Sequence, residues 1–175
     1  MQYRHIFREG KVCAVRITKR TNIAMRLLMF CAANPGRLVT KSEVAGCCNV
    51  SENHLAQVIN QLSQLGYLNT QRGRNGGLVL GRAPEEIKVG EVFRDVEGDP
   101  PMTKCFADVD NSCPLARACR LKAILGDAAR AFYAQLDEVT LDALTCDNIE
   151  LLEMLQPPIA CGQGRDAPSR ALARA

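Results

Sequence analysis

Apolar residues recur every three or four positions in the first third of the chain, and this period predicts consecutive helices. The first helix has an apolar face made of Ile23, Leu27, Phe30 and Cys31. The breaking sequence Asn34-Pro35-Gly36 ends it. Thr40 and Glu43 have the spacing of a capping box, so we expect a short second helix from there to about Cys48.

A third helix is predicted where Ser51 precedes another apolar stripe. Serine is a favoured N-cap residue, and Glu52 in the first turn suits the positive end of the helix dipole. Gly66 ends the helix. The buried stripe consists of Leu55, Val58, Ile59, Leu62 and Leu65. Helix, short helix, tight turn and helix is the order of a helix-turn-helix.

Strand patterns follow at 67–70 and 78–80, joined by the glycine-rich turn 71–77. A β-hairpin directly after a helix-turn-helix indicates a winged module. Pro84 then opens a short connecting helix. Its inward-facing residues are Val89, Val92, Phe93 and Val96.

A long apolar stripe follows Pro114 and predicts a long helix. Its members are Leu121, Leu125, Ala128, Phe132, Leu136 and Val139. Such a stripe on a small module needs a partner helix, and a second copy of the chain is the simplest partner, so we expect a homodimer. The predicted fold class is mainly α: a winged helix-turn-helix with a two-stranded β wing and a long dimerisation helix.

The predicted organisation follows from these patterns. It comprises an N-terminal arm at 1–15, a DNA-binding winged helix-turn-helix at 16–82, a connecting helix at 83–97, a cysteine loop at 98–119, the dimerisation helix at 120–146, and a short helix with a disordered tail at 147–175.

Composition narrows the functional class. No apolar run approaches the ~18 residues of a membrane span, and the charged first residues lack the apolar stretch of a signal peptide, so we expect a cytoplasmic protein. The chain has nine cysteines, and in the reducing cytosol these favour metal binding over disulfides. It has no tryptophan, which disfavours binding of single strands by base stacking. No Ser-His-Asp set, nucleotide-binding glycine loop or paired-carboxylate signature appears, so no enzyme is predicted.

The outer face of the third helix and the hairpin turn predict contacts with double-stranded DNA. An amide stripe opposite the apolar stripe suits base edges in the major groove, because amides both donate and accept hydrogen bonds. Arginines on a glycine-rich turn suit a minor groove or phosphates. A solvated polar face is the alternative, and the helix-turn-helix context favours recognition. The candidate contacts are Ser51, Asn53, His54, Gln57, Asn60, Arg72, Arg74 and Asn75, with phosphate contacts from Arg16, Lys19, Arg20 and Lys41.

Cys105, Cys113 and Cys119 form the candidate metal site. They lie in a polar loop that cannot be part of a core, and three soft sulfur ligands can hold iron with one position open. The close cysteine pairs of a structural zinc site are missing. We interpret Cys31, Cys47 and Cys48 as packing residues and Cys161 as a tail thiol.

The chain resembles the NsrR-type nitric-oxide-sensitive repressors, within the IscR-like winged-helix iron–sulfur regulators. The resemblance covers about residues 16–145 and is carried by ITKRTNIAMRLLMFCA, VSENHLAQVINQLSQLGYLNTQRGRNGGLVLGR, the cysteine loop and LKAIL. It implies a homodimer crossed through the long helix, with a cluster in each subunit whose nitrosylation or loss releases operator DNA. Lys122 stands where the IscR arrangement has a histidine ligand, which favours [4Fe–4S] over [2Fe–2S].

The chain differs from the family pattern at the position expected to supply the fourth cluster ligand. Relatives often have an aspartate near the start of the first helix that can ligate from the partner subunit, and Asn22 stands there in this chain. An amide oxygen is a poorer ligand than a carboxylate. Two other interpretations stay open: a redox or iron–sulfur-status regulator of the same fold, and a winged-helix protein with a structural zinc site.

Overall fold

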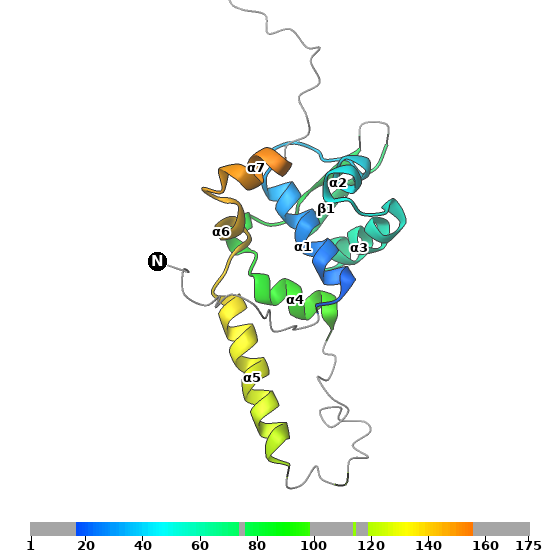
Figure 1. Ribbon diagram of the computed structural model, residues 1–175. Helices are drawn as coiled ribbons and strands as arrows, with labels where there is room; N and C mark the ends of the chain where they lie inside the picture. Colours follow the sequence, from blue (N-terminus) through cyan, green and yellow to red (C-terminus); the bar gives the residue numbers. More distant parts are fainter. Residues whose placement is uncertain (1–16, 74–75, 99–113, 115–118, 156–175) are drawn as a thin grey trace, which may run out of the picture.

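Three helices and a hairpin form a packed module in the first half of the chain. The computed structural model describes residues 17–73, 76–98, 114 and 119–155. Helices α1 (Lys19–Ala32), α2 (Lys41–Cys48) and α3 (Glu52–Gln64) precede strands β1 (Leu68–Gln71) and β2 (Gly77–Leu80). There follow the 3-10 turn η1 (Pro84–Glu86), α4 (Val89–Glu97), α5 (Arg120–Asp137), α6 (Leu141–Thr145) and α7 (Ile149–Leu155). Figure 1 shows α5 extending away from the module, whereas α6 and α7 return to it.

Helix α1 is the centre of the core. Leu27, Leu28 and Phe30 are fully buried, and α1 packs against α3, α4 and α6. Leu62 of α3 and Leu141 of α6 are also fully buried. Each such side chain stabilises the fold by about 1.5–3 kcal/mol relative to leaving it in water. The module therefore completes its core within one chain.

The wing is fastened to the loop between α1 and α2. Strands β1 and β2 are antiparallel, with Leu68 opposite Leu80. Val39 in the loop exchanges two backbone hydrogen bonds with Leu78, at 2.9 and 2.8 Å. A Cβ at Gly77 would lie 2.9 Å from the Val39 carbonyl oxygen, so this close approach requires glycine.

The predicted fold class is confirmed, and so are most predicted helix ends in the module. The capping box is present: Thr40 Oγ1 accepts from the Glu43 N–H, and the Glu43 carboxylate accepts from the Thr40 N–H. Asn49 (φ 51°) makes the tight turn before α3, and Gly66 (φ 79°) follows its last turn. These features depend on residues close in sequence, which explains why the pattern predicted them.

The connecting helix and the long helix differ from prediction. One helix was expected from Pro84, but η1 and α4 are separated at Ile87, which is extended, fully buried and accepts from the Leu141 N–H at 2.8 Å. The dimerisation helix is predicted over 120–146, whereas α5 runs from Arg120 to Asp137 and therefore ends earlier. A β-bridge between Lys88 and Thr140 holds the chain extended just beyond that end. Leu65, predicted to be buried, is 38% exposed because it lies after the last turn of α3.

Candidate DNA interface and cysteine site

The outer face of α3 is a stripe of exposed amides, Asn53, Gln57, Asn60 and Gln64. The opposite face is buried and consists of Leu55, Val58, Ile59 and Leu62. Packing of that face against α1 and α2 determines which side of α3 points outward. Helix α3 lies at the edge of the module (Figure 1). Its amide stripe faces solvent, where it could meet base edges.

The first turn of α3 holds polar side chains in fixed pairs. Ser51 was expected to cap the helix, but its side chain makes no cap hydrogen bond; Oγ lies 2.7 Å from Nδ1 of His54. The Glu52 carboxylate accepts from Lys41 Nζ at 2.8 Å and from Ser42 Oγ at 3.0 Å, and these hydrogen bonds lower the pKa of Glu52. Lys41, a candidate phosphate contact, is thus already paired with a carboxylate.

Only part of the predicted wing surface lies among the described residues. Arg72 is exposed, as are Lys19 and Arg20 at the start of α1. Arg74 and Asn75 at the tip, and Arg16 before α1, lie outside the described residues. The exposed cations fit phosphate contacts.

Helix α4 connects α3, the candidate DNA-binding helix, to α5. Gln61 of α3 donates to the Val96 carbonyl at 3.3 Å, and the Tyr67 hydroxyl donates to Asp95 Oδ2 at 2.6 Å. Burial, followed by this hydrogen bond, raises the pKa of Tyr67, so the hydroxyl stays protonated. On the other side of α4, Arg94 makes a bidentate pair with Asp137 of α5, at 2.5 and 3.1 Å.

The start of α1 also contacts α4. The Thr18 N–H donates to Glu97 Oε1 at 2.8 Å, and Glu97 is the last residue of α4. Asn22, implied as the fourth cluster ligand, is exposed in the first turn of α1. The beginning of α1 therefore adjoins the point from which the chain enters the cysteine segment.

Of the three predicted cysteine ligands, Cys119 alone lies among the described residues. It is partly buried and is the N-cap of α5, where the positive end of the helix dipole suits an anionic sulfur ligand. Cys105 and Cys113 lie outside the described residues. Within the described ranges, no group of three or more His, Cys, Asp or Glu side chains has metal-binding geometry. Cys119 fits the role of one cluster ligand, and the three-cysteine set stays a prediction.

Two of the three cysteines interpreted as packing residues are in the core. Cys31 is 4% exposed and Cys48 8%, and burial raises their pKa values to about 12 and about 11. Both thiols are therefore protonated at neutral pH, which makes them poor nucleophiles and ligands. The interpretation was wrong for Cys47, which is exposed and donates its S–H to the Met154 carbonyl.

Helix α5 contrasts with the module because none of its side chains is buried. Leu121 is 60% exposed and Ile124 62%. Its main packing is against α4, where Phe132 meets Phe93 with ring centroids 6.3 Å apart. No helix in the described part of the chain is both long and apolar enough to cross a bilayer.

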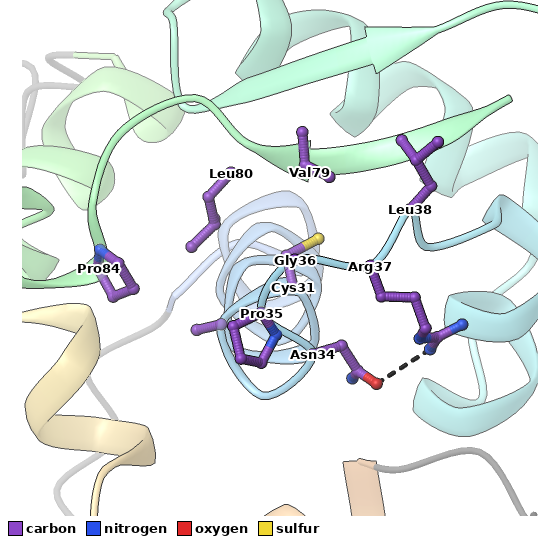
Figure 2. A pocket seen from close by; sticks show the side chains of 10 residues that line it. Cys31, Asn34, Pro35, Gly36, Arg37, Leu38, Val79, Leu80 and Pro84 are labelled. Carbon is purple, nitrogen blue, oxygen red and sulfur yellow. Dashed lines mark hydrogen bonds between the residues drawn. The ribbon is translucent and has the colours of Figure 1, made fainter.

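A pocket of about 400 Å³ lies between the end of α1, the following loop and β2 (Figure 2). Pro35, Leu38 and Leu80 contribute apolar surface, and Arg37 donates to Asn34 Oδ1 at 3.0 Å on its rim. None of the candidate DNA-binding or cluster-binding residues lines it. The pocket is separate from both predicted sites.

Sequence reasoning missed the contacts that join α3 to α4. Gln61 lies between the amide stripe and the apolar stripe, and Tyr67 fits the strand pattern, so neither stands out in the sequence as a contact residue. A polar residue at the edge of a buried helix face is the available signal for such a contact, but the sequence does not identify the partner.

The comparisons with known proteins agree with this architecture. A family model described as Rrf2, iron-dependent transcriptional regulator, matches residues 17–147. The HTH-type transcriptional regulator NsrR of Bacillus subtilis is 39% identical over 143 residues, which cover 81% of this chain and 98% of that protein. The NsrR of Halalkalibacterium halodurans is 37% identical with the same coverage.

Solved structures show the same fold. CymR, the global cysteine regulator of B. subtilis, has a TM-score of 0.57 and 26% identity, covering 75% of this chain and 97% of CymR. IscR of T. potens has a TM-score of 0.60 and 24% identity, covering 77% and 88%. The named relatives are transcriptional regulators rather than enzymes. With a winged helix-turn-helix and a family match over most of its length, the chain belongs to the Rrf2 family of transcriptional regulators.

Proposed function

We propose that the chain is a homodimeric repressor that binds double-stranded operator DNA and senses nitric oxide through an iron–sulfur cluster. The cluster proposed is [4Fe–4S], with [2Fe–2S] as the alternative. Cys105, Cys113 and Cys119 would hold it, and Asn22 of the partner subunit is the proposed fourth ligand. When bound, the cluster supplies iron that reacts with nitric oxide. The observation that carries the proposal is the exposed amide face of α3, joined through α4 to the segment that contains the cysteines.

The contacts of α4 support coupling between the cysteine segment and DNA. That segment begins directly after Gly98, and the residues just before it contact α1 through Glu97 and α3 through Val96. A displacement at this end of α4 would act on both helices directly. Because two half-sites require a matched spacing of the recognition helices, a small change in their relation would weaken binding.

Anaerobic purification and titration with nitric oxide test the proposal. We expect a coloured protein that binds operator DNA selected from a random library and releases it as its visible absorbance changes. Cys105→Ala, Cys113→Ala and Cys119→Ala should each abolish both the colour and the tight binding. Cys146→Ala is the matched control, because Cys146 is exposed and lies outside the cysteine segment.

The same experiment separates the alternatives. A colourless protein that retains zinc and binds DNA would support the structural zinc site. A coloured protein that releases DNA on oxidation or cluster loss, but is indifferent to nitric oxide, would support a redox or iron–sulfur-status regulator. Tight operator binding by the three alanine variants would contradict the coupling.

A further inference from the structure

Ser51 differs from the other hydroxyl residues that precede described helices. Thr18, Thr40 and Thr140 each accept a hydrogen bond from the backbone N–H three residues later, as N-caps do. Ser51 occupies the same position before α3, but its Oγ lies against the ring of His54. The hydroxyl is therefore used to hold a side chain rather than the helix backbone.

This hydrogen bond leaves one ring nitrogen of His54 available. A neutral imidazole has two distinct nitrogens, and the contact at Nδ1 both orients the ring and determines the role of Nε2. His54 is exposed and lies one turn before Gln57. Its neighbour Glu52 does not compete for Ser51, because its carboxylate is held by Lys41 and Ser42.

We propose that Ser51 is a positioning residue that makes His54 a reader of guanine. When the Ser51 hydroxyl donates to Nδ1, the proton of the neutral ring is on Nε2, which then donates outward. Guanine presents two adjacent acceptors, N7 and O6, in the major groove. Phosphates and guanine edges are acceptors, so approach to DNA favours this tautomer. The inference rests on the proposed DNA-binding function. It adds that guanine is the nucleobase contacted by His54 and that Ser51 orients the ring.

Base-by-base binding measurements test this role. An operator is first selected from random duplex DNA with the anaerobically purified protein, and every base pair is then replaced in turn. For wild type, we expect one guanine in each half-site whose replacement by 7-deazaguanine weakens binding about fivefold, the effect of one hydrogen bond. His54→Ala should remove this sensitivity at that position alone.

Substitutions of Ser51 separate positioning from capping. Glycine is nearly as good an N-cap as serine, so Ser51→Gly should leave the stability of α3 nearly unchanged. It should nevertheless lower the 7-deazaguanine effect to less than about twofold, whereas Ser51→Thr should retain it. Thr140→Gly is the matched control: it removes a hydroxyl that caps α6, and the base profile should not change.

The outcomes distinguish a failure of the positioning role of Ser51 from a failure of the proposed DNA-binding function. An unchanged base profile in Ser51→Gly, or equal losses in the glycine and threonine variants, would overturn the positioning role while DNA binding stood. If wild-type protein selects no DNA sequence, the proposed function fails and the reading of guanine by His54 fails with it.

Discussion

The winged module and helix α5 use apolar residues in opposite ways. In the module, Phe30 and Leu62 are fully buried within one chain, whereas in α5 Leu121 and Ile124 are more than half exposed. Both regions have helical apolar stripes of similar clarity in the sequence. The stripe therefore predicts a helix in each case, but only the packing shows that the core around α1 is completed within one chain. The exposed face of α5 is what we expect of a helix that pairs with a second copy.

The largest expected effect is a loss of folding stability, which should be much greater for a substitution in the module than for one in α5. Phe30→Ala should lower the free energy of unfolding by about 3–5 kcal/mol, because it opens a cavity in the module core. Phe132→Ala, on the partly buried side of α5, is the matched control and should cost less than half as much. Denaturant unfolding measures both. Equal losses would mean that α5 belongs to the same core.

The next largest effect is on DNA binding by the exposed face of α3, where substitutions should leave the stability of the fold unchanged. Gln57→Ala should weaken operator binding by about 1–3 kcal/mol and relax sequence preference if its amide makes a bidentate base contact. Gln64→Ala, at the C-terminal end of the same stripe, should have a clearly smaller effect, because recognition helices contact bases mainly near their N-terminal end. Arg74→Ala should weaken operator and random DNA alike if it contacts phosphate. Equal effects of Gln57→Ala on both DNAs would refute base reading by Gln57.

A smaller effect is expected on the association of two chains. Leu121→Ala should weaken dimerisation by about 1–2 kcal/mol over the two copies, since less apolar surface is removed from water. Gln135→Ala, an exposed polar position on α5, should have no effect. Sedimentation equilibrium gives the dissociation constants. If Leu121→Ala lowered the free energy of unfolding of the module as much as that of dimerisation, the two regions would not be independent.

The smallest effect is a pH dependence of the stability of the module. Burial raises the pKa of Glu43, but hydrogen bonds from Thr40 and Arg37 outweigh it and leave the pKa below its ordinary value of 4.5. The folded pKa is thus below the unfolded one, so Glu43 stabilises the fold above pH 4.5 and loses this contribution as the pH falls through the folded pKa. Glu43→Gln keeps an acceptor for the Thr40 N–H but loses the charge that pairs with Arg37, so it should lower the free energy of unfolding by about 0.2–1 kcal/mol at pH 7. The difference from wild type should shrink on acidification, as followed by denaturant unfolding between pH 7 and pH 3; a constant difference would contradict this linkage.

Sequence patterns predicted the parts of the fold that depend on near neighbours. The capping box at Thr40 and the amphipathic α3 follow from residues three and four apart. The interruption at Ile87 and the end of α5 could not be predicted in this way, because both result from contacts between residues about fifty positions apart. Sequence placed the candidate base contacts on one helix, but it could not show that the Ser51 hydroxyl bonds to His54, since serine at an N-cap ordinarily bonds to the backbone.

The anchoring of α4 and α5 has a consequence for how this protein can evolve. Helix α4 is fixed in the core by Val92 and Val96, and Arg94 fastens α5 to it by Asp137. The two helices that flank residues 99–118 are thus held to each other at Arg94 and Asp137, a contact that does not involve those residues. Doubling the length of a flexible connection costs only about 0.6 kcal/mol. If residues 99–118 act as the proposed sensing segment, its length and ligand spacing can therefore change while the winged module keeps its geometry, and a change of signal does not require a change of operator.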